Sequence, residues 1–163
     1  MAYPFSIPQT FKVVDATAGP VTTNGGVTSD YVSLKNALKA WVVVQFTQAV
    51  GHATTVAIRQ ASAVAGTSVK AITVAVPIWA NEDTAASDTL EAQTAAVSYA
   101  VTNDVKKKMV IFEIDPATLD LANGFDCLNF TVSDSSQATN FVSGMFFLWE
   151  RYQQATPPSA ISD

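Results

Sequence analysis

Few side chains in this chain of 163 residues could carry out acid–base, nucleophilic or metal chemistry. His52 is the one histidine and Cys127 the one cysteine. A catalytic triad places a histidine between a nucleophile and an acid, and the sequence has no Gly-x-Ser-x-Gly motif to supply a serine nucleophile. His52 stands in a glycine turn, where we expect an exposed side chain. One histidine and one distant cysteine also cannot complete the closed nitrogen and sulfur ligand set that zinc prefers.

Carboxylates form two groups, one between residues 82 and 88 and one around Pro116. Neither group has the ligand spacing and central glycine of a calcium-binding loop. Glu113 and Glu150 are the pair that a glycosidase would require, because that reaction uses two opposed carboxylates across a cleft. On the strands of a sandwich such side chains usually face solvent. The sequence therefore predicts no catalytic residue, no metal ligand and no cofactor, and a protein that is not an enzyme.

The chain has few charged residues and a net negative charge. Nine Lys and Arg residues against fourteen Asp and Glu residues give a net charge of −5, and charged residues make up 14% of the chain, well below the roughly 25% of an ordinary soluble domain. Without a basic stripe, the chain is not expected to bind nucleic acid. The short cluster Lys106-Lys107-Lys108 is predicted to be a solvated loop or the guard of an edge strand.

Hydropathy indicates more apolar surface than one core would bury. The mean hydropathy is +0.21, with 48% hydrophobic residues, and oligomerisation or docking would cover the excess. A single cysteine fits folding in a reducing cytoplasm. The first eight residues lack the features of a signal peptide, and no run of about 20 apolar residues is present to span a bilayer. We therefore expect a soluble protein with no membrane partner.

Strand patterns must position any functional side chains. The run 41–46 is apolar without strict alternation, which is typical of a strand covered on both faces. Together with residues 54–60 it is predicted to form a hairpin. Pro77 should lie on an edge or at a bulge, because proline cannot donate to a ladder. Asp115 before Pro116 predicts a short helical turn. Further strands are predicted at 71–79, 97–102, 108–114, 125–132 and 141–152.

About eight or nine short strands without long helical patterns predict an all-β fold, an antiparallel β-sandwich or jelly roll. Residues 30–152 are predicted to form this domain. Residues 1–29, rich in Pro, Gly, Thr and Asn, are predicted to form an extended N-terminal arm with one strand at 11–14, and residues 153–163 an extended C-terminal tail. The arm is expected either to lie on a neighbouring molecule or to be a frayed terminus.

Aromatic residues in the strand patterns are predicted to belong to the core or to a subunit interface rather than to a sugar-stacking platform. Trp79 is the best exception, because it ends its strand beside the acidic segment 82–88. Cys127 is predicted to be buried and unreactive. The residues predicted to contact partner molecules are Tyr3, Phe5, Ile7, Phe11, Trp79, Phe147, Trp149 and Tyr152.

Several segments carry a resemblance to a known group of proteins. The stretch Ser-Asp-Tyr-Val-Ser-Leu-Lys-Asn at 29–36, followed by Lys-Ala-Trp-Val-Val at 39–43, resembles the N-terminal signature of a group of tailed-bacteriophage virion proteins. Segments 76–83, 112–116 and 124–127 are similar to the same group in the same order. The resemblance spans residues 29–152. Its segments are packing and turn segments with no catalytic signature.

This resemblance implies a small β-sandwich of the phage particle, a capsid decoration (cement) protein that binds the outside of the major capsid protein lattice and stabilises the capsid. It would be made in the host cytoplasm and lie on the capsid surface of the virion. Its partners would be the major capsid protein and copies of itself, as a dimer or a trimer, with the arm and the tail reaching adjacent subunits. Two alternatives remain open: a phage tail or head-fibre module that binds a receptor or glycan, and a glycan hydrolase.

Overall fold

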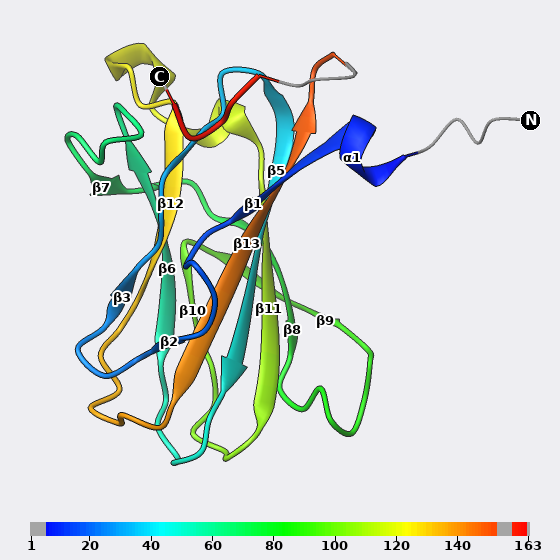
Figure 1. The fold of residues 1–163 in the computed structure, drawn as a ribbon, viewed down its shortest axis with the longest axis vertical. Helices are drawn as coiled ribbons and strands as arrows, with labels where there is room; N and C mark the ends of the chain where they lie inside the picture. Colours follow the sequence, from blue (N-terminus) through cyan, green and yellow to red (C-terminus); the bar gives the residue numbers. More distant parts are fainter. Residues whose placement is uncertain (1–5, 153–157, 163) are drawn as a thin grey trace, which may run out of the picture.

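The computed structural model describes residues 6–152 and 158–162. Two antiparallel sheets pack face to face, which confirms the predicted β-sandwich (Figure 1). Sheet A contains β1 (Phe11–Asp15), β2 (Val21–Thr22), β5 (Ala37–Thr47), β8 (Val76–Asn81), β9 (Glu91–Ala96), β11 (Lys107–Ile114) and β13 (Phe141–Glu150). Sheet B contains β3 (Val27–Thr28), β4 (Val32–Ser33), β6 (Thr55–Ala61), β7 (Lys70–Ala71), β10 (Ser98–Ala100) and β12 (Cys127–Val132). The helical segments are α1 (Ile7–Thr10), η1 (Pro116–Thr118) and η2 (Leu121–Asn123).

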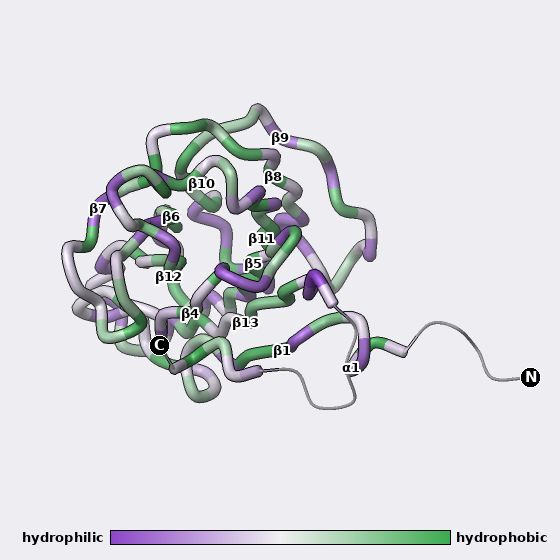
Figure 2. The backbone as a smooth tube through the Cα atoms, turned by 90° about the horizontal axis from the view of Figure 1, so that it is seen from above, coloured by the Kyte–Doolittle hydropathy of each residue, from purple (hydrophilic) through white to green (hydrophobic). Residues whose placement is uncertain are grey.

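Strand β5 lies in the middle of sheet A. The order of strands in this sheet is β1-β13-β5-β11-β8-β9, with β2 beside the start of β13. In sheet B the order is β10-β6-β12-β3, with β4 also on β12 and β7 on β6. Figure 2 looks along the sandwich from above and shows the two layers, with β6 and β12 on one side and β5, β11 and β13 on the other. No helix among the described residues is long and apolar enough to cross a membrane.

The core lies between the sheets and is built from alternate residues of each strand. In β5 the inward side chains include Val42, Val44 and Phe46, all fully buried or nearly so. Phe130 of β12 meets Phe146 of β13 across the interior, with ring centroids 6.0 Å apart. Burial of such side chains stabilises the fold by about 1.5–3 kcal/mol each. The alternation follows from the pleat of a strand, which turns successive side chains to opposite faces.

The hairpin predicted from residues 41–46 and 54–60 is wrong. Strand β5 belongs to sheet A and β6 to sheet B, so the connection between them is an arch from one sheet to the other. The side chain of Asn140 holds this arch: its Oδ1 accepts from the backbone N–H groups of Ala49 (2.8 Å) and Val50 (2.9 Å), and its Nδ2 donates to the carbonyl of Val50. A distant amide therefore supplies the hydrogen bonds that a hairpin would have made within itself.

Most of the segment predicted as an N-terminal arm lies within the sandwich. Strands β1 and β2 pair with β13, and β3 pairs with β12. Ala16, between β1 and β2, is fully buried. Gly25 and Gly26 adopt positive φ angles, which let the chain turn tightly between the two short strands. The glycines that suggest a loose arm therefore serve tight connections; residues 1–5 lie outside the described part.

The described part of the C-terminal segment, residues 158–162, contacts its own domain. The carbonyl of Ala160 accepts from the backbone N–H of Ser33 at 2.7 Å, and the Ala160 side chain is buried. Lys12 of β1 donates to the carbonyl of Pro158. The chain therefore returns to the sandwich after residues 153–157, which lie outside the description.

Two local predictions are confirmed. Pro77 lies where the register between β8 and β9 shifts, which is a bulge, so its missing N–H interrupts no regular ladder bond. Asp115 caps η1 by accepting from the N–H of Ala117 at 2.9 Å, and Pro116 takes the first helical position.

Candidate protein-binding surface

The face of sheet A that points away from sheet B carries rows of apolar side chains. In one row Val43 of β5 is paired with Met145 of β13 and with Ile111 of β11, and Ile111 is paired in turn with Trp79 of β8. Residues paired directly across antiparallel strands share a face and touch. This row crosses four strands with no charged residue, and on the fifth strand, β1, the residue paired with Met145 is the exposed Asp15.

A second row runs beside it through Trp41. Phe147 of β13 is paired with Trp41, and Val13 of β1 with Phe147. On the other side of Trp41 stands Glu113 of β11. We define the outer face as the apolar residues of these and the adjoining rows: Phe11, Val13, Trp41, Val43, Trp79, Met109, Ile111, Met145, Phe147 and Trp149.

The outer face is exposed at its margins and hollow near its middle. Val13 is 46% exposed, Trp149 42% and Met145 38%. A hollow of about 300 Å³ has an entirely apolar lining. The side chains that line it are Ile7, Phe11, Trp41, Val43, Ile111 and Phe147. Projecting side chains beside an apolar hollow are suited to contact with another protein surface.

Two tryptophans of the outer face are held in place by polar and aromatic neighbours. The edge of Phe11 meets the ring of Trp41 with centroids 5.7 Å apart, and Lys39 Nζ lies 5.2 Å from the Trp41 ring centroid. Trp79 donates from Nε1 to Glu113 Oε1 at 2.9 Å. Glu113 also forms an ion pair with Lys39. These contacts fix the side chains before any partner arrives, which lowers the entropy cost of binding.

The ion pair neutralises the charge near the middle of the outer face, whereas Asp15 of β1, paired with Met145, is an exposed carboxylate at its margin. The hydrogen bond from Lys39, assisted by that from Trp79, holds the pKa of the Glu113 carboxyl below its ordinary value. Glu113 is thus a carboxylate with its acceptors occupied by Lys39 and Trp79. It supports the position of Trp79 rather than standing free as an acid or base.

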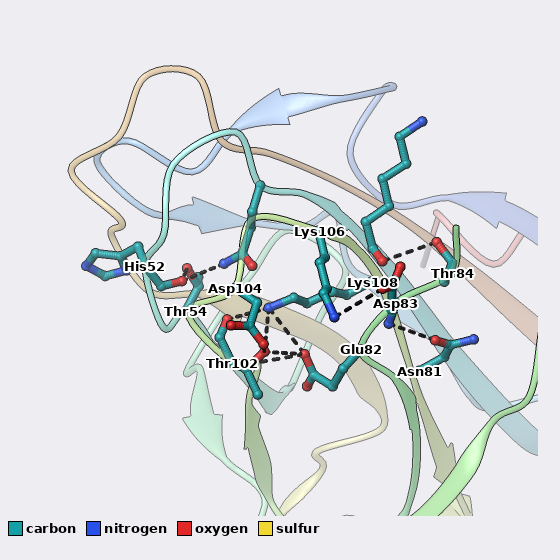
Figure 3. A network of polar contacts seen from close by, with 12 residues as sticks. His52, Thr54, Asn81, Glu82, Asp83, Thr84, Thr102, Asp104, Lys106 and Lys108 are labelled. Carbon is teal, nitrogen blue, oxygen red and sulfur yellow. Dashed lines mark hydrogen bonds and ion pairs between the residues drawn. The ribbon is translucent and has the colours of Figure 1, made fainter. Parts of the chain in front are cut away.

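Behind the outer face, a polar network anchors the strand that carries Trp79 (Figure 3). The side chain of Lys108 is fully buried; its Nζ donates to Thr102 Oγ1 at 2.7 Å and lies 3.3 Å from Glu82 Oε2. Glu82 also accepts from the Tyr99 hydroxyl at 2.8 Å. Burial, and then the hydrogen bond to Glu82, raises the pKa of the Tyr99 phenol. The network ties the loop after β8 to β10 and β11.

The solvated cluster predicted for residues 106–108 is wrong for Lys108. Alternation along β11 turns Lys108 inward with Val110 and Phe112, and the buried ammonium is accepted because it has an ionic partner and oxygen acceptors. Its neighbour Lys106 remains near the surface, 3.1 Å from Asp83.

The other residues considered for chemistry lie apart from one another. Glu113 belongs to the outer face, whereas Glu150 is buried, and burial raises the pKa of its carboxyl. They do not form an opposed pair across a cleft. His52 is half-buried in the arch after β5, and Cys127 is buried as predicted. Among the described residues, no group of three or more His, Cys, Asp and Glu side chains could hold a metal ion.

The structure brings together most of the residues predicted to contact partners. Phe11, Trp79, Phe147 and Trp149 lie on the outer face, and Ile7 of α1 lines its hollow. Tyr152 is 75% exposed just after β13. Tyr3 and Phe5 lie outside the described residues.

Sequence reasoning missed the residues at the centre of the outer face. The run 41–46, apolar except for Gln45, was predicted to be covered on both faces, with Trp41 in the core or a subunit interface, so neither Trp41 nor Val43 was named among the partner-contacting residues. The absence of alternation in that run was the available signal: it indicates cover on both faces, and the second cover need not come from the same chain.

Comparison with known proteins gives limited information. No protein-family model matches the chain, and no curated protein matches it. Among solved structures, the chain is similar to YomS, derived from the SPBc2 prophage, with 11% identity, 85% of this chain and 91% of that chain covered, and a TM-score of 0.45. It is also similar to a chain of Broad Bean Stain Virus (12% identity, 97% and 96% covered, TM-score 0.34) and to a CBM4 structure (9% identity, 90% and 87% covered, TM-score 0.30). These scores are low, so no function is transferred from these proteins.

Proposed function

We propose that this protein is a non-enzymatic structural component of a tailed-phage virion, which binds the outside of the major capsid protein lattice and stabilises the capsid. The resemblance of segments 29–43 and 76–83 to phage virion proteins gives the class. The observation that supports a role as a subunit of an assembly is the outer face of sheet A, a wide apolar surface that no described part of the chain covers apart from α1 at one end. The capsid lattice as that assembly comes from the resemblance.

Such a surface marks a subunit of an assembly. Soluble monomers rarely expose large contiguous apolar patches, and those that do use them for binding. Tryptophan, methionine and phenylalanine, which the outer face combines, are enriched in protein interfaces. A chain with only 14% charged residues also has little charge with which to keep its surfaces apart from other proteins.

Stabilisation of the capsid would follow from mass action. A protein that binds the assembled lattice and not its dissociated subunits stabilises the lattice by about 2.7 kcal/mol per site when its free concentration is about 100 times Kd. Several weak contacts made by one subunit can raise its overall affinity by about 10²–10⁴ through effective concentration. No reaction and no cofactor is required.

The test is addition of the purified protein to capsids that lack it. We expect the protein to co-sediment with the capsids in a saturable manner and to raise the temperature or chaotrope concentration at which they break. Failure to bind, or binding without any gain in resistance, would refute the proposal. Binding to a glycan array or to host cells in place of capsids would support the tail or head-fibre alternative.

A further inference from the structure

We infer that the outer face of sheet A is the contact surface of a homodimer, in which two copies of the chain pack these faces together across a twofold axis. The inference deepens the proposed function, on which it rests for the view that the chain is a subunit, and it names a second copy as the partner of this face.

The middle of β5 is apolar on both of its faces. Val42 and Val44 point into the sandwich, and Trp41 and Val43 point away from it. In an antiparallel sandwich with a solvated outer side, we expect polar residues at the outward positions. The outward positions of β5 are polar towards its ends, at Lys39, Gln45 and Thr47. Between them they are apolar, at Trp41 and Val43, and there the described chain covers the inner side only.

The size of the face matches what a stable dimer needs. Five neighbouring strands spaced about 4.8 Å apart and about eight residues long, at about 3.3 Å per residue, give a projected area on the order of 600 Å². Because side chains project from the sheet, the solvent-accessible area of the face is larger than this projected area. The result is close to the roughly 800 Å² that each partner contributes to a standard stable interface.

The charge on the face is compatible with a second copy. Lys39 and Glu113 neutralise each other within one chain, and the remaining charge, Asp15, lies at the margin of the face beside Met145. Two identical faces can therefore meet without a like-charge clash at their centres. A partner chosen by electrostatic complementarity would instead call for a net charge on the face.

The shape of the face suits self-association. Met145 and Trp149 project beside the apolar hollow, so each copy offers both a projection and a recess, as an isologous contact requires. Sheets that pack face to face lie about 10 Å apart with strands turned by about 30°. The entirely apolar hollow also favours a permanent partner, because obligate homodimer interfaces are the more apolar class.

A second copy of the chain is a better candidate than the capsid lattice to cover the outer face, because it is present as soon as the chain is made. A face this apolar needs cover from the moment the chain folds, before any shell is present to bind. Another copy of the same chain is at hand during synthesis. The lattice would then be met by the ends and edges of the dimer rather than by the outer face.

The experiment measures the oligomeric state of the full chain in the absence of capsids, by light scattering after size exclusion and by sedimentation equilibrium. We expect a dimer of twice the monomer mass of 17.3 kDa. Val43→Glu places two carboxylates in the contact and should raise the dimer dissociation constant by about 100-fold or more. Val13→Glu, at the margin of the face, should raise it by about 10-fold or more.

The matched control is Val74→Glu. Val13 and Val74 are the same residue type and are both 46% exposed, but Val74 lies in the connection before β8 and not on the outer face. The control should remain dimeric. If Val43→Glu does not fold by circular dichroism, Val13→Glu against Val74→Glu decides the question.

Several outcomes would overturn the inference: a wild-type monomer at about 10 µM, a trimer, or a folded Val43→Glu variant that dimerises as well as the wild type. A monomer that still binds capsids would refute the dimer and leave the proposed function standing. A dimer that fails to bind capsids would support the dimer contact and refute the proposed function.

Discussion

The buried ammonium of Lys108 depends on Glu82, and this dependence can be measured by a double-mutant cycle. Lys108 has no exposed side-chain surface, whereas the Glu82 side chain is 28% exposed. Removing Glu82 leaves Lys108 buried with only the oxygens of Thr102 as partners. Removing Lys108 leaves Glu82 partly hydrated and still accepting from Tyr99 and Thr102. The two substitutions should therefore have unequal effects.

The magnitudes follow from this difference in exposure. Glu82→Ala should lower the free energy of unfolding by about 3–5 kcal/mol, because it leaves a buried charge without its counter-ion. Lys108→Met keeps the volume and should cost about 1–2 kcal/mol, since the remaining carboxylate retains water and hydrogen bonds. The double variant should lose less than the sum of the two, with a coupling energy of about 1–3 kcal/mol.

The assay is urea unfolding at pH 7, followed by fluorescence and circular dichroism, with a common m-value required for the comparison. The control is the adjacent exposed pair Lys106 and Asp83, whose side chains are 43% and 30% exposed. Asp83→Ala should cost much less than Glu82→Ala, because surface ion pairs contribute little to stability. If Glu82→Ala costs as little as Asp83→Ala, or if the effects of Glu82→Ala and Lys108→Met simply add, then Glu82 does not hold the Lys108 charge and the reasoning fails.

Three further predictions concern the core and its margin. Gly144→Ala would place a Cβ 2.5 Å from Cζ of the buried Phe130 ring. It should lower the free energy of unfolding in urea by about 1–3 kcal/mol. This loss of stability should be smaller when Phe130 is also replaced by Leu, and an equal loss in that background would contradict the clash. Burial raises the pKa of the Glu150 carboxyl above its ordinary value of 4.5. The folded state therefore binds this proton more tightly than the unfolded state does. As a result, the wild type loses stability as the pH rises from below 4.5 through the raised pKa. Glu150→Gln should therefore melt higher than the wild type at pH 7 and equally at pH 3.5, and no difference at pH 7 would refute the burial argument. Cys127 is fully buried and should react with a thiol reagent only after unfolding, so rapid labelling of the native protein would contradict its position.

The class of the fold follows from local patterns, whereas the assignment of strands to sheets does not. Alternation at Val56 and Ile58 places both on one face whether β6 forms a hairpin with β5 or an arch to the other sheet. The contacts that decide between these come from Asn140, about ninety positions away in the sequence. Information held in a distant side chain is not present in the pattern of the segment itself.

Short strands are hidden for a related reason. Strands β2 and β3 contain two residues each, too few to show a period of two. Their pairing with β13 and β12 is set by those long strands, which provide ladder positions for whatever backbone is brought beside them. A segment rich in glycine and threonine is thus recruited into both sheets, although its own composition predicts an arm.

Some residues of the outer face could be predicted from the sequence to contact partners, and others could not. Phe147 and Trp149 were expected to contact partners, because an apolar strand at the end of the domain has side chains on both faces. Trp41 was expected in the core or a subunit interface, and Val43 in a strand covered on both faces. The pattern shows how many faces of a strand are covered, but whether the cover comes from the same chain is decided by the tertiary fold.

The two sheets of the sandwich provide an internal comparison for the outer face. On β6 and β12 of sheet B, the outward positions include Thr55, Arg59 and Thr131, which are polar and partly exposed. On β5 of sheet A, the outward positions hold Trp41 and Val43 between the polar Lys39 and Gln45. Both sheets share one core and one chain composition, so the difference is a property of their outer faces. The outer face of sheet A is therefore the more apolar of the two, as the proposed dimer contact would require.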